Sequence, residues 1–353
     1  MASVTPLRPP PHDDLAIARA HLRRLYDVAR GHKRALVLTH DNPDPDSMAS
    51  ALALAFLLER GAGVRAQVAY GGIIGRAENR ALVRVLKLAA VPLSRVDIGA
   101  FDLFGLVDTQ PSIGNHSLPP GLHVDLVIDH HPPRVQSQAA AFHDVGGEFG
   151  ATSTILASYV RAAGLRPPRA LATALFYGIK SDTRDLHREF VGADVDNYLW
   201  LFPFADKAAL ASIEHPELPS EYFAAYHSAY EKARLYGHAV VVDLGELYAP
   251  DLVAEIAERM LSLEGMKWSL ALGTYGGQLF LSVRTSDRRM NAGRLVRRLM
   301  DGRPGGSAGG HGAMAGARLP LPKAGARRLS AAVVRDFLRA FDVGRKKGVK
   351  LVP

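Results

Sequence analysis

The sequence predicts an α/β protein of two domains: a first domain with a mainly parallel sheet covered by helices on both faces, and a smaller second α/β domain. In the first half of the chain, short apolar runs alternate with helix-like stretches, and several of these runs end in histidine or aspartate. A second alternating pattern begins near Leu235. Apolar strands separated by helices are typical of parallel sheets. At 353 residues and 48% hydrophobic composition, the chain exceeds what one hydrophobic core usually serves.

The elements of the first domain follow from changes in hydrophobic period. The proline-rich residues 1–12 are predicted to be a disordered lead, and residues 13–190 to form the domain, which opens with an amphipathic helix. Apolar runs of strand length stand at 35–39, 64–70, 103–107 and 124–128. Helices are predicted at 15–28, after the first strand through residue 60, and at 77–88, 151–163 and 169–179.

The second domain is predicted to follow a helical connector over residues 191–234, in which HPELPSEY indicates a loop. It spans 235–345, with strands at 238–243, 268–273 and 279–284 and a helix at 331–341. A basic tail, residues 346–353, ends the chain. We expect the active site in a cleft between the two domains, which would limit substrate length.

Composition narrows the functional classes. No apolar run reaches the eighteen or so residues that a membrane helix needs, and the start lacks the apolar centre of a signal peptide, so a cytoplasmic protein without membrane contact is expected. The formal charge of +8 favours a polyanionic ligand. Cysteine is absent, which excludes disulfides and thiolate metal sites. Histidine and carboxylate ligands favour Mn²⁺, with Mg²⁺, Co²⁺ and Zn²⁺ as alternatives.

A polar loop, HDNPDPD over residues 40–46, follows the first predicted strand and leads into a helix. Its two prolines fix their φ angles, which reduces the entropy lost when Asp44 and Asp46 are held in metal-binding geometry. The structural alternative is a capped turn with Asp46 as the helix N-cap. That alternative explains neither His40 nor the polar residues at the other strand ends.

Ligands of open parallel sheets gather beyond the carboxyl ends of the strands, where several of this chain's polar residues fall. A pair of catalytic divalent ions needs carboxylates, a bridging ligand and open positions for water and phosphate. The sequence therefore predicts two divalent ions. Their proposed ligands are His40 and Asp44 for one ion, Asp46, His130 and Asp182 for the other, and Asp108 as the catalytic bridge.

The run Asp129-His130-His131 supplies two further roles. Asp129 is predicted to hydrogen-bond a ligand imidazole and so fix its tautomer. His131 is then available to bind the scissile phosphate or to protonate the leaving oxygen. A surface or helix-capping histidine is the structural alternative for His131.

A glycine-rich segment, GGSAGGHG over residues 305–312, follows the strand that ends at Arg284 and is expected to precede a helix. Glycines permit positive φ and close backbone approach, so successive N–H groups can cradle an anion. Taken alone, such a segment is more often a flexible linker. Next to Arg284, it favours a phosphate or nucleobase clamp.

These motifs resemble the DHH phosphoesterase superfamily, in particular the nanoRNase and pAp phosphatase branch with a DHHA1 second domain. The matching segments, over residues 33 to 320, are THDNPDPDSMASALAL, LVDTQ, VIDHHP, ATSTIL, GIKSDT, LSVRTS and GGSAGGHGAMAGA. The resemblance implies the same six metal ligands and a phosphate-contacting His131. It also implies nucleotide contacts from Arg284, Gly309, Gly310 and His311. One departure is the Ser307-Ala308 interruption of the usual compact glycine run, which affects the end-group pocket.

The resemblance implies hydrolysis of very short RNA oligonucleotides, including linear dinucleotides, to mononucleotides, and dephosphorylation of 3′-phosphoadenosine 5′-phosphate (pAp). The sequence allows a homodimer and leaves no room for the OB-fold of a long-substrate nuclease; no long duplex is expected as partner. An inorganic pyrophosphatase or short-chain polyphosphatase is an alternative, since NPDPDS also resembles family II pyrophosphatases, although their lysine-rich second-domain signature is absent. A catalytically silent nucleotide sensor is a further alternative, which the intact set of six ligands disfavours.

Overall fold

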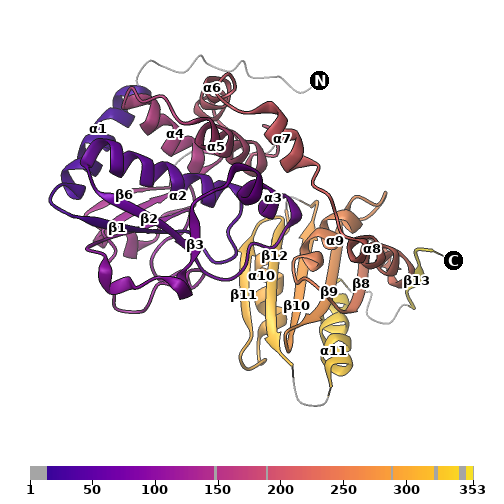
Figure 1. Ribbon diagram of the computed structural model, residues 1–353. Helices are drawn as coiled ribbons and strands as arrows, with labels where there is room; N and C mark the ends of the chain where they lie inside the picture. Colours follow the sequence, from indigo (N-terminus) through magenta and orange to yellow (C-terminus); the bar gives the residue numbers. More distant parts are fainter. Residues whose placement is uncertain are drawn as a thin grey trace. The chain divides into compact units, whose positions relative to one another are not determined.

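The computed structural model describes residues 14–146, 149–187, 190–287, 289–321, 325–341 and 347–352, without the side chains of Asp14 and His311. The chain forms two compact units, one ending at Pro216 and the other beginning at Glu217 (Figure 1). Each unit is an α/β structure with its own sheet, so the predicted fold class is confirmed. The predicted domain boundaries and the cleft stay predictions, and the predicted lead lies outside the described residues.

The first unit is built on a six-stranded sheet in which every described pair is parallel, in the order β3-β2-β1-β4-β5-β6. The sequence identifies the four inner strands because they are apolar and of ordinary length. It misses β3 and β6, which are short edge strands. The bounds are β1 Arg34–Leu38, β2 Arg65–Tyr70, β3 Ala90–Pro92, β4 Leu103–Val107, β5 Leu126–Asp129 and β6 Phe142–Val145.

Long helices cover one face of this sheet, where α2 packs on β1, β2 and β4, α1 on β6 and α4 on β5 (Figure 1). Their small and apolar residues form one core with Val37, Val68 and Ile128 of the sheet. A π-helical turn, Leu58–Ala62, continues α2. The helices are α1 Asp14–Ala29, α2 Pro45–Leu57, α3 Ala77–Leu86, α4 Thr152–Ala162, α5 Arg169–Asp182, α6 Gly192–Leu201 and α7 Lys207–Glu214.

The other face of the sheet is covered differently. Leu36, Leu38 and Leu106 point to a second core, which is closed by apolar residues from 91–104 and 118–124. These segments contain two 3₁₀ helices, Leu93–Arg95 and Ile98–Ala100, and a third 3₁₀ helix, Val135–Ala139, follows β5. The described cover of this face therefore consists of short 3₁₀ helices and loops, whereas long α-helices cover the other face.

The second unit holds a seven-stranded sheet in the order β11-β12-β10-β9-β8-β7-β13, in which only the described pair β8 and β9 is parallel. Gly276 and Gly277, with φ of +53° and +74°, connect β9 to β10 in a two-residue hairpin loop that requires positive φ. The strands are β7 Arg234–Tyr236, β8 Ala239–Glu246, β9 Trp268–Tyr275, β10 Gln278–Thr285, β11 Ser307–His311, β12 Met314–Pro320 and β13 Val349–Lys350.

Helices cover both faces of the second sheet. One core joins the sheet to Val296 of α10 and to Val333 and Phe337 of α11, and a separate core joins it to Ala229 of α8 and Ile256 of α9. The predicted basic tail contributes the edge strand β13. The helices are α8 Ser220–Lys232, α9 Leu252–Leu261, α10 Ala292–Met300 and α11 Ala326–Arg339. No helix of the described residues is long and apolar enough to span a bilayer.

The packing of α5 against α2 depends on Gly178. A Cβ added at this position would lie 2.3 Å from the Oγ of Ser153 and 3.3 Å from the Cα of Asp46. We expect Gly178→Ala to lower the free energy of unfolding by about 1–3 kcal/mol through overpacking, despite alanine's higher helix propensity. Thermal unfolding tests this, with Gly99→Ala as control because the nearest atom to its added Cβ is at 3.5 Å. Equal melting temperatures for Gly178→Ala and wild type would contradict the expectation.

Candidate metal centre

The loop that joins β1 to α2 places His40 and Asp44 at the carboxyl end of the sheet. The Nδ1 of His40 lies 2.9 Å from the carbonyl oxygen of Asp41, so the imidazole directs Nε2 toward the carboxylates. The side chain of Asp44 accepts from the N–H of Ser47, and Ser47 Oγ accepts from the N–H of Asp44. Asp44 is therefore the N-cap of α2 and Pro45 its first residue, which corrects the alternative with Asp46 as cap.

Two glycines after β2 hold this loop in place. A Cβ on Gly71 would lie 1.9 Å from a carboxylate oxygen of Asp41, and Gly72 has φ of +67°. The carbonyl of Gly71 accepts from the N–H of Asn42 at 3.0 Å. Only glycine permits this approach, so Gly71 and Gly72 position the ligand loop. Neither glycine is among the predicted site residues, although two adjacent glycines directly after a strand indicate a tight turn.

Asp108 lies at the middle of the cluster, directly after β4. Its backbone has φ of +57°, a conformation that aspartate adopts more readily than most residues but that still stores strain. One carboxylate oxygen lies 3.5 Å from His40 Nε2 and the other 3.7 Å from His130 Nε2. The side chain is only 4% exposed. Asp108 thus turns one oxygen toward each of two histidines on neighbouring strands.

The six predicted ligands form two groups of three, with a histidine of each group facing the Asp108 carboxylate. His40, Asp44 and Asp108 form the first, and Asp46, His130 and Asp182 form the second, with the ligand atoms of each group within 4.8 Å of one another. His130 Nε2 lies 3.2 Å from a carboxylate oxygen of Asp182. Ligands that bind one ion at about 2.1 Å lie about 3–3.4 Å apart, so small adjustments would let each group hold an ion.

The amino end of α4 fixes two of these carboxylates. The N–H groups of Thr152 and Ser153 donate to the two carboxylate oxygens of Asp46 at 2.8 and 2.7 Å. The hydroxyl of Thr152 donates to Asp108 at 2.9 Å. Negative charge is favoured at a helix N-terminus, so α4 stabilises ionised Asp46 in place.

The carboxylates of the cluster repel one another, which favours a bound cation. Burial raises the pKa of Asp46 well above its usual value, and the negative charges of Asp108, Asp182 and Asp44 raise it further. Burial lowers the pKa of His40, but its contacts with Asp108 and Asp44 outweigh this and the net pKa is well raised. Buried carboxylates that repel one another in this way fit a divalent ion, which neutralises them. The residues present therefore match the donor set and the charge that a metal requires.

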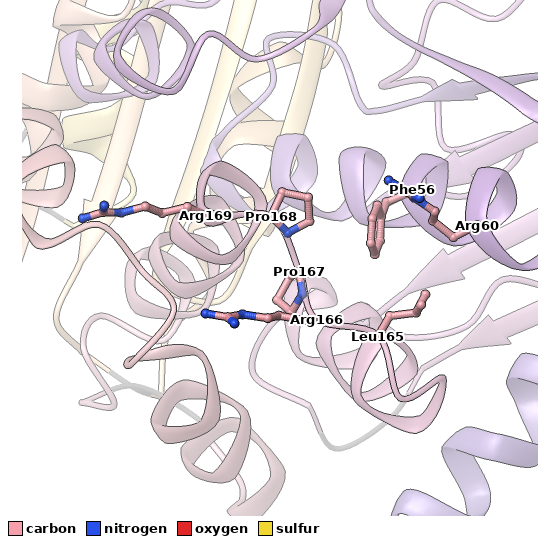
Figure 2. Close-up of a pocket in the computed structure, with 7 residues that line it drawn as sticks. All are labelled: Phe56, Arg60, Leu165, Arg166, Pro167, Pro168 and Arg169. Atoms are coloured by element: carbon pink, nitrogen blue, oxygen red, sulfur yellow. The ribbon is translucent and has the colours of Figure 1, made fainter.

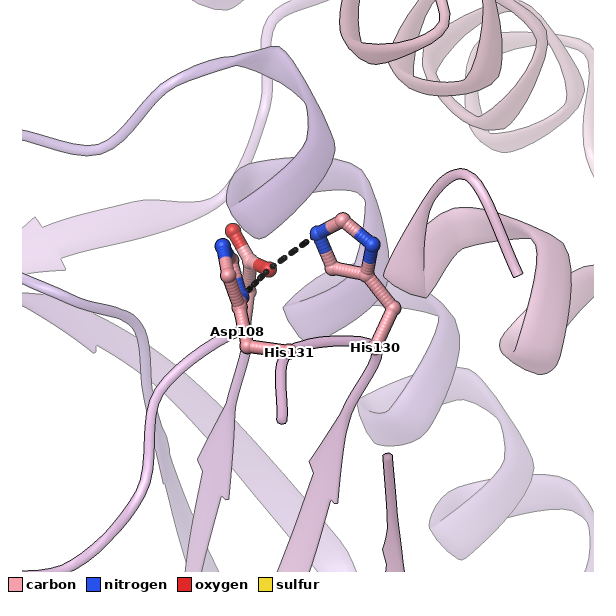
Figure 3. A group of neighbouring side chains, drawn as sticks. All are labelled: Asp108, His130 and His131. Atoms are coloured by element: carbon pink, nitrogen blue, oxygen red, sulfur yellow. Dashed lines mark ion pairs between the residues drawn. The ribbon is translucent and has the colours of Figure 1, made fainter. Parts of the chain in front are cut away.

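His131 lies on the open side of the cluster, with its ring 4.2 Å from that of His130 and its side chain 38% exposed (Figure 3). Asp129 accepts from both the backbone N–H and the Nδ1 of His131, at 3.1 and 2.8 Å. The Nδ1 of His130 instead lies 3.2 Å from the carbonyl oxygen of Phe149. Asp129 therefore orients His131 and not His130, and its predicted contact with a ligand imidazole stays a prediction.

Burial lowers the pKa of His131, but Asp129, Asp108 and Asp182 raise it more, and it stands at about 9. The buried Gln110 donates to the second oxygen of Asp129 at 2.7 Å. His131 Nδ1 also lies 3.6 Å from Asp108, which makes Asp108, His130 and His131 a third group of candidate ligands. The arrangement presents a protonated imidazole beside the two predicted ion positions.

Comparison with known proteins identifies two family domains in this chain. Residues 34–179 match the DHH family N-terminal domain, and residues 237–340 match the DHHA1 domain. The chain therefore carries a DHH family N-terminal domain followed by a DHHA1 domain. Five of the six predicted metal ligands lie within the segment that matches the DHH domain. The sixth, Asp182, lies three residues beyond that segment, at the end of α5.

Two similar proteins extend the comparison. An uncharacterized protein of Methanocaldococcus jannaschii is 36% identical over 288 residues, which cover 81% of this chain and 58% of that protein. This chain therefore spans a little over half the length of that relative. The crystal structure of an exopolyphosphatase-related protein from Bacteroides fragilis has a TM-score of 0.71 at 14% identity, covering 92% of this chain and 96% of the other. At this identity the likeness concerns the fold.

The structure of the DHHA1 domain changes the prediction for the glycine-rich segment. Residues 307–311 form the edge strand β11, which pairs with β12. The sequence predicts a helix after the glycines, but this segment forms the strand β12. A Cβ on Gly310, whose φ is +117°, would lie 2.5 Å from Ala315 Cα, so the hairpin itself requires this glycine. Arg284 lies on β10 with 8% of its surface exposed, Gly309 is on β11, and the side chain of His311 lies outside the described residues.

Thr152 and Gln110 were missed as site residues, although both stand in the motifs ATSTIL and LVDTQ. We expect Thr152→Val to weaken Mn²⁺ binding by about 10–100-fold, because it removes the hydroxyl that orients Asp108. Titration calorimetry tests this. Thr173→Val is the control, since its hydroxyl donates to Arg169 at the far end of α5. An unchanged affinity of Thr152→Val for Mn²⁺ would show that the hydroxyl does not orient the carboxylate of Asp108.

The metal-free DHH domain is expected to lose stability as the pH rises from 5 to 8. Burial, with Asp44 and Asp108, raises the pKa of Asp182 to about 7 despite His130 and His131. Between the usual carboxyl pKa of about 4 and 7, the folded state binds more protons than the unfolded state, so stability falls with pH. The raised pKa of His131 acts in the same direction.

Melting temperatures of EDTA-treated protein across this range measure the effect. Added Mn²⁺ is expected to remove the slope, because a bound cation favours the ionised carboxylates. A metal-free melting temperature that rises with pH would contradict the electrostatic account.

Proposed function

We propose that this protein is a metal-dependent phosphoesterase that hydrolyses very short RNA oligonucleotides, including linear dinucleotides, to mononucleotides, and that also dephosphorylates pAp. The observation that carries the proposal is the buried Asp108, whose two oxygens face His40 and His130 in two separate ligand groups. A binding protein would need neither a carboxylate between two groups nor a protonated histidine beside them. We propose that it acts in the cytoplasm.

The two ligand groups would hold two divalent ions, and Mn²⁺ suits their imidazole and carboxylate donors best. Bound ions would supply Lewis acidity toward a phosphoryl oxygen and would lower the pKa of a bound water. His40, Asp44 and Asp108 would hold one ion, and Asp46, His130 and Asp182 the other, with Asp108 shared. The N–H groups of Thr152 and Ser153 at the start of α4 hold both carboxylate oxygens of Asp46 in place, and a bound cation would favour its ionised form.

His131 performs the step that a side chain must supply. Its Nδ1 is engaged by Asp129, which leaves Nε2 as the nitrogen that meets substrate. In the metal-free site its pKa stands at about 9, so the ring carries a proton there at neutral pH. It can donate a charge-assisted hydrogen bond to a phosphoryl oxygen and give its proton to the leaving oxygen.

We propose that the DHHA1 domain binds the part of the substrate remote from the reacting phosphate. Arg284 on β10 and the Gly309-Gly310-His311 segment of β11 supply the candidate contacts, a guanidinium and an edge-strand backbone. Binding energy from such remote contacts orients the reacting group, so truncated substrates are expected to lose turnover rate as well as affinity. The Ser307-Ala308 interruption makes this segment the place where substrate preference would differ.

An inorganic pyrophosphatase or short-chain polyphosphatase is the second candidate. The NPDPDS loop favours it, and the Bacteroides fragilis protein of similar fold is described as exopolyphosphatase-related. Both candidates use the same metal centre, and a requirement for a nucleoside separates them.

The test is a parallel assay of purified protein with Mn²⁺ on a 5′-labelled RNA dinucleotide, pAp, pyrophosphate and a short polyphosphate. Release of mononucleotides from the dinucleotide, lost in Asp108→Asn, is the expected result. Turnover of pyrophosphate or polyphosphate alone would replace the proposal by the second candidate. Absence of turnover on all four would overturn the enzymatic reading and favour a nucleotide sensor.

A further inference from the structure

A second candidate binding site lies in the first unit, at the opposite ends of the helices that carry the metal ligands. α2 brings Asp46 to the metal centre at its start and Phe56 to a cavity near its end, ten residues later, which is about 15 Å along a helix. α5 carries Arg169 at its start and Asp182 at its end. The cavity is therefore remote from the metal centre, and nothing in the proposed reaction uses it.

The cavity has a volume of about 440 Å³ and lies between the end of α2 and the connection from α4 to α5 (Figure 2). A neighbouring cavity of about 360 Å³ shares Arg166, Pro167 and Arg169 with it and reaches Pro203 and Phe204. Volumes of this size suit small ligands. In Figure 2, Phe56 and Leu165 lie on one side of the two prolines, whereas the side chains of Arg166 and Arg169 extend together to the other side.

The arginines here are arranged to bind an anion. The guanidinium of Arg166 lies over the Phe204 ring, 5.5 Å from its centroid, and that of Arg60 lies over Phe56 at 5.9 Å. Stacking on a ring holds a guanidinium flat and leaves its in-plane N–H donors for a bidentate acceptor. Among the described residues, no carboxylate forms an ion pair with Arg60 or Arg166.

Arg169 is the third cation and has one acidic neighbour. Its Nε lies 3.1 Å from a carboxylate oxygen of Asp206, which also caps α7 by accepting from the N–H groups of Ala208 and Ala209. Asp206 shares its charge between these contacts, so it offsets at most one of the three arginines. The lining therefore has a net positive charge beside an apolar wall.

We propose that these joined cavities bind a small phosphate-bearing molecule, with its phosphate at Arg166 and Arg169 and its apolar or planar part near Phe56, Leu165 and Pro167. Phosphate matches the bidentate donors of the two guanidiniums, and a flat ring or short apolar group matches the wall. A nucleoside monophosphate has both parts, and inorganic phosphate has only the first. The site is independent of the proposed hydrolysis.

The test is calorimetric titration of the full-length protein, treated with EDTA so that the metal centre does not attract phosphate. AMP, inorganic phosphate and adenosine are the probes. The site variant is Arg166→Gln with Arg169→Gln, whose loss of one surface ion pair costs little stability. The matched control is Arg19→Gln with Arg23→Gln, which removes two exposed arginines of α1.

AMP binding that weakens at least tenfold in the site variant and is unchanged in the control is the expected result. Inorganic phosphate that binds as tightly as AMP supports the anion site and assigns recognition to the phosphate alone. Adenosine that binds as well as AMP, AMP affinity equal in wild type and site variant, or no AMP binding at millimolar concentration would each overturn the proposal. Hydrolysis by the site variant in the presence of Mn²⁺ is expected at the wild-type rate, which separates this site from the metal centre.

Discussion

Replacing Asp108 by asparagine is expected to lower the rate of metal-dependent hydrolysis by roughly 1,000-fold, because two ions together contribute several kcal/mol to transition-state stabilisation. Asparagine keeps the size of the side chain and is among the residues that best tolerate the φ of +57° at this position. It also retains an oxygen to accept from Thr152. The variant therefore removes the bridging charge with little change in folding.

The measurement is kcat on the best substrate, together with metal content after dialysis. Asp41→Asn is a suitable control, because it changes an aspartate of the loop that carries His40, whose carboxylate accepts from the hydroxyl of Ser117, and it leaves the backbone contact with His40 in place. An Asp108→Asn enzyme that keeps both ions and a tenth or more of its activity would contradict the bridging role.

The second large effect is expected at His131. His131→Gln should lower kcat by about 100-fold or more, since general acid catalysis contributes roughly 10²–10⁴-fold, while metal content stays at the wild-type level. Glutamine can still donate a hydrogen bond but cannot give up a proton to the leaving oxygen. Loss of an ion in His131→Gln would instead assign His131 to the third ligand group, with Asp108 and His130.

Asp129→Asn distinguishes a positioning role from a catalytic one. The carboxylate of Asp129 both orients the His131 ring and raises its pKa. Its loss is expected to move the limb of the pH–rate profile that reports deprotonation of His131 toward lower pH. A purely structural Asp129 would lower the rate at every pH without moving that limb.

The predicted ligands lie close together in the structure because they stand at the carboxyl ends of parallel strands or next to them. His40 after β1, Asp108 after β4 and His130 after β5 reach one sheet edge by topology alone, so the strand pattern brings them together. Asp44 and Asp46 follow within one loop. Asp182 could be included because α5 runs back toward that edge.

The remaining details depend on contacts that no local pattern encodes. Asp129 lies one residue before His130 and two before His131, and it contacts His131 because the carbonyl of Phe149 engages the Nδ1 of His130. Thr152 reaches Asp108 across 44 residues of sequence. The GGSAGGH segment has loop composition but forms β11, because tertiary pairing with β12 outweighs the low strand propensity of glycine.

The most direct test of the central claim is the number and position of bound ions. Crystals of the protein grown with Mn²⁺, measured at the manganese absorption edge, should give two anomalous peaks, one beside His40 and Asp44 and one beside Asp46, His130 and Asp182, with Asp108 between them. A single peak held by Asp108, His130 and His131 would contradict the two-ion centre and, with it, the mechanism proposed for this protein.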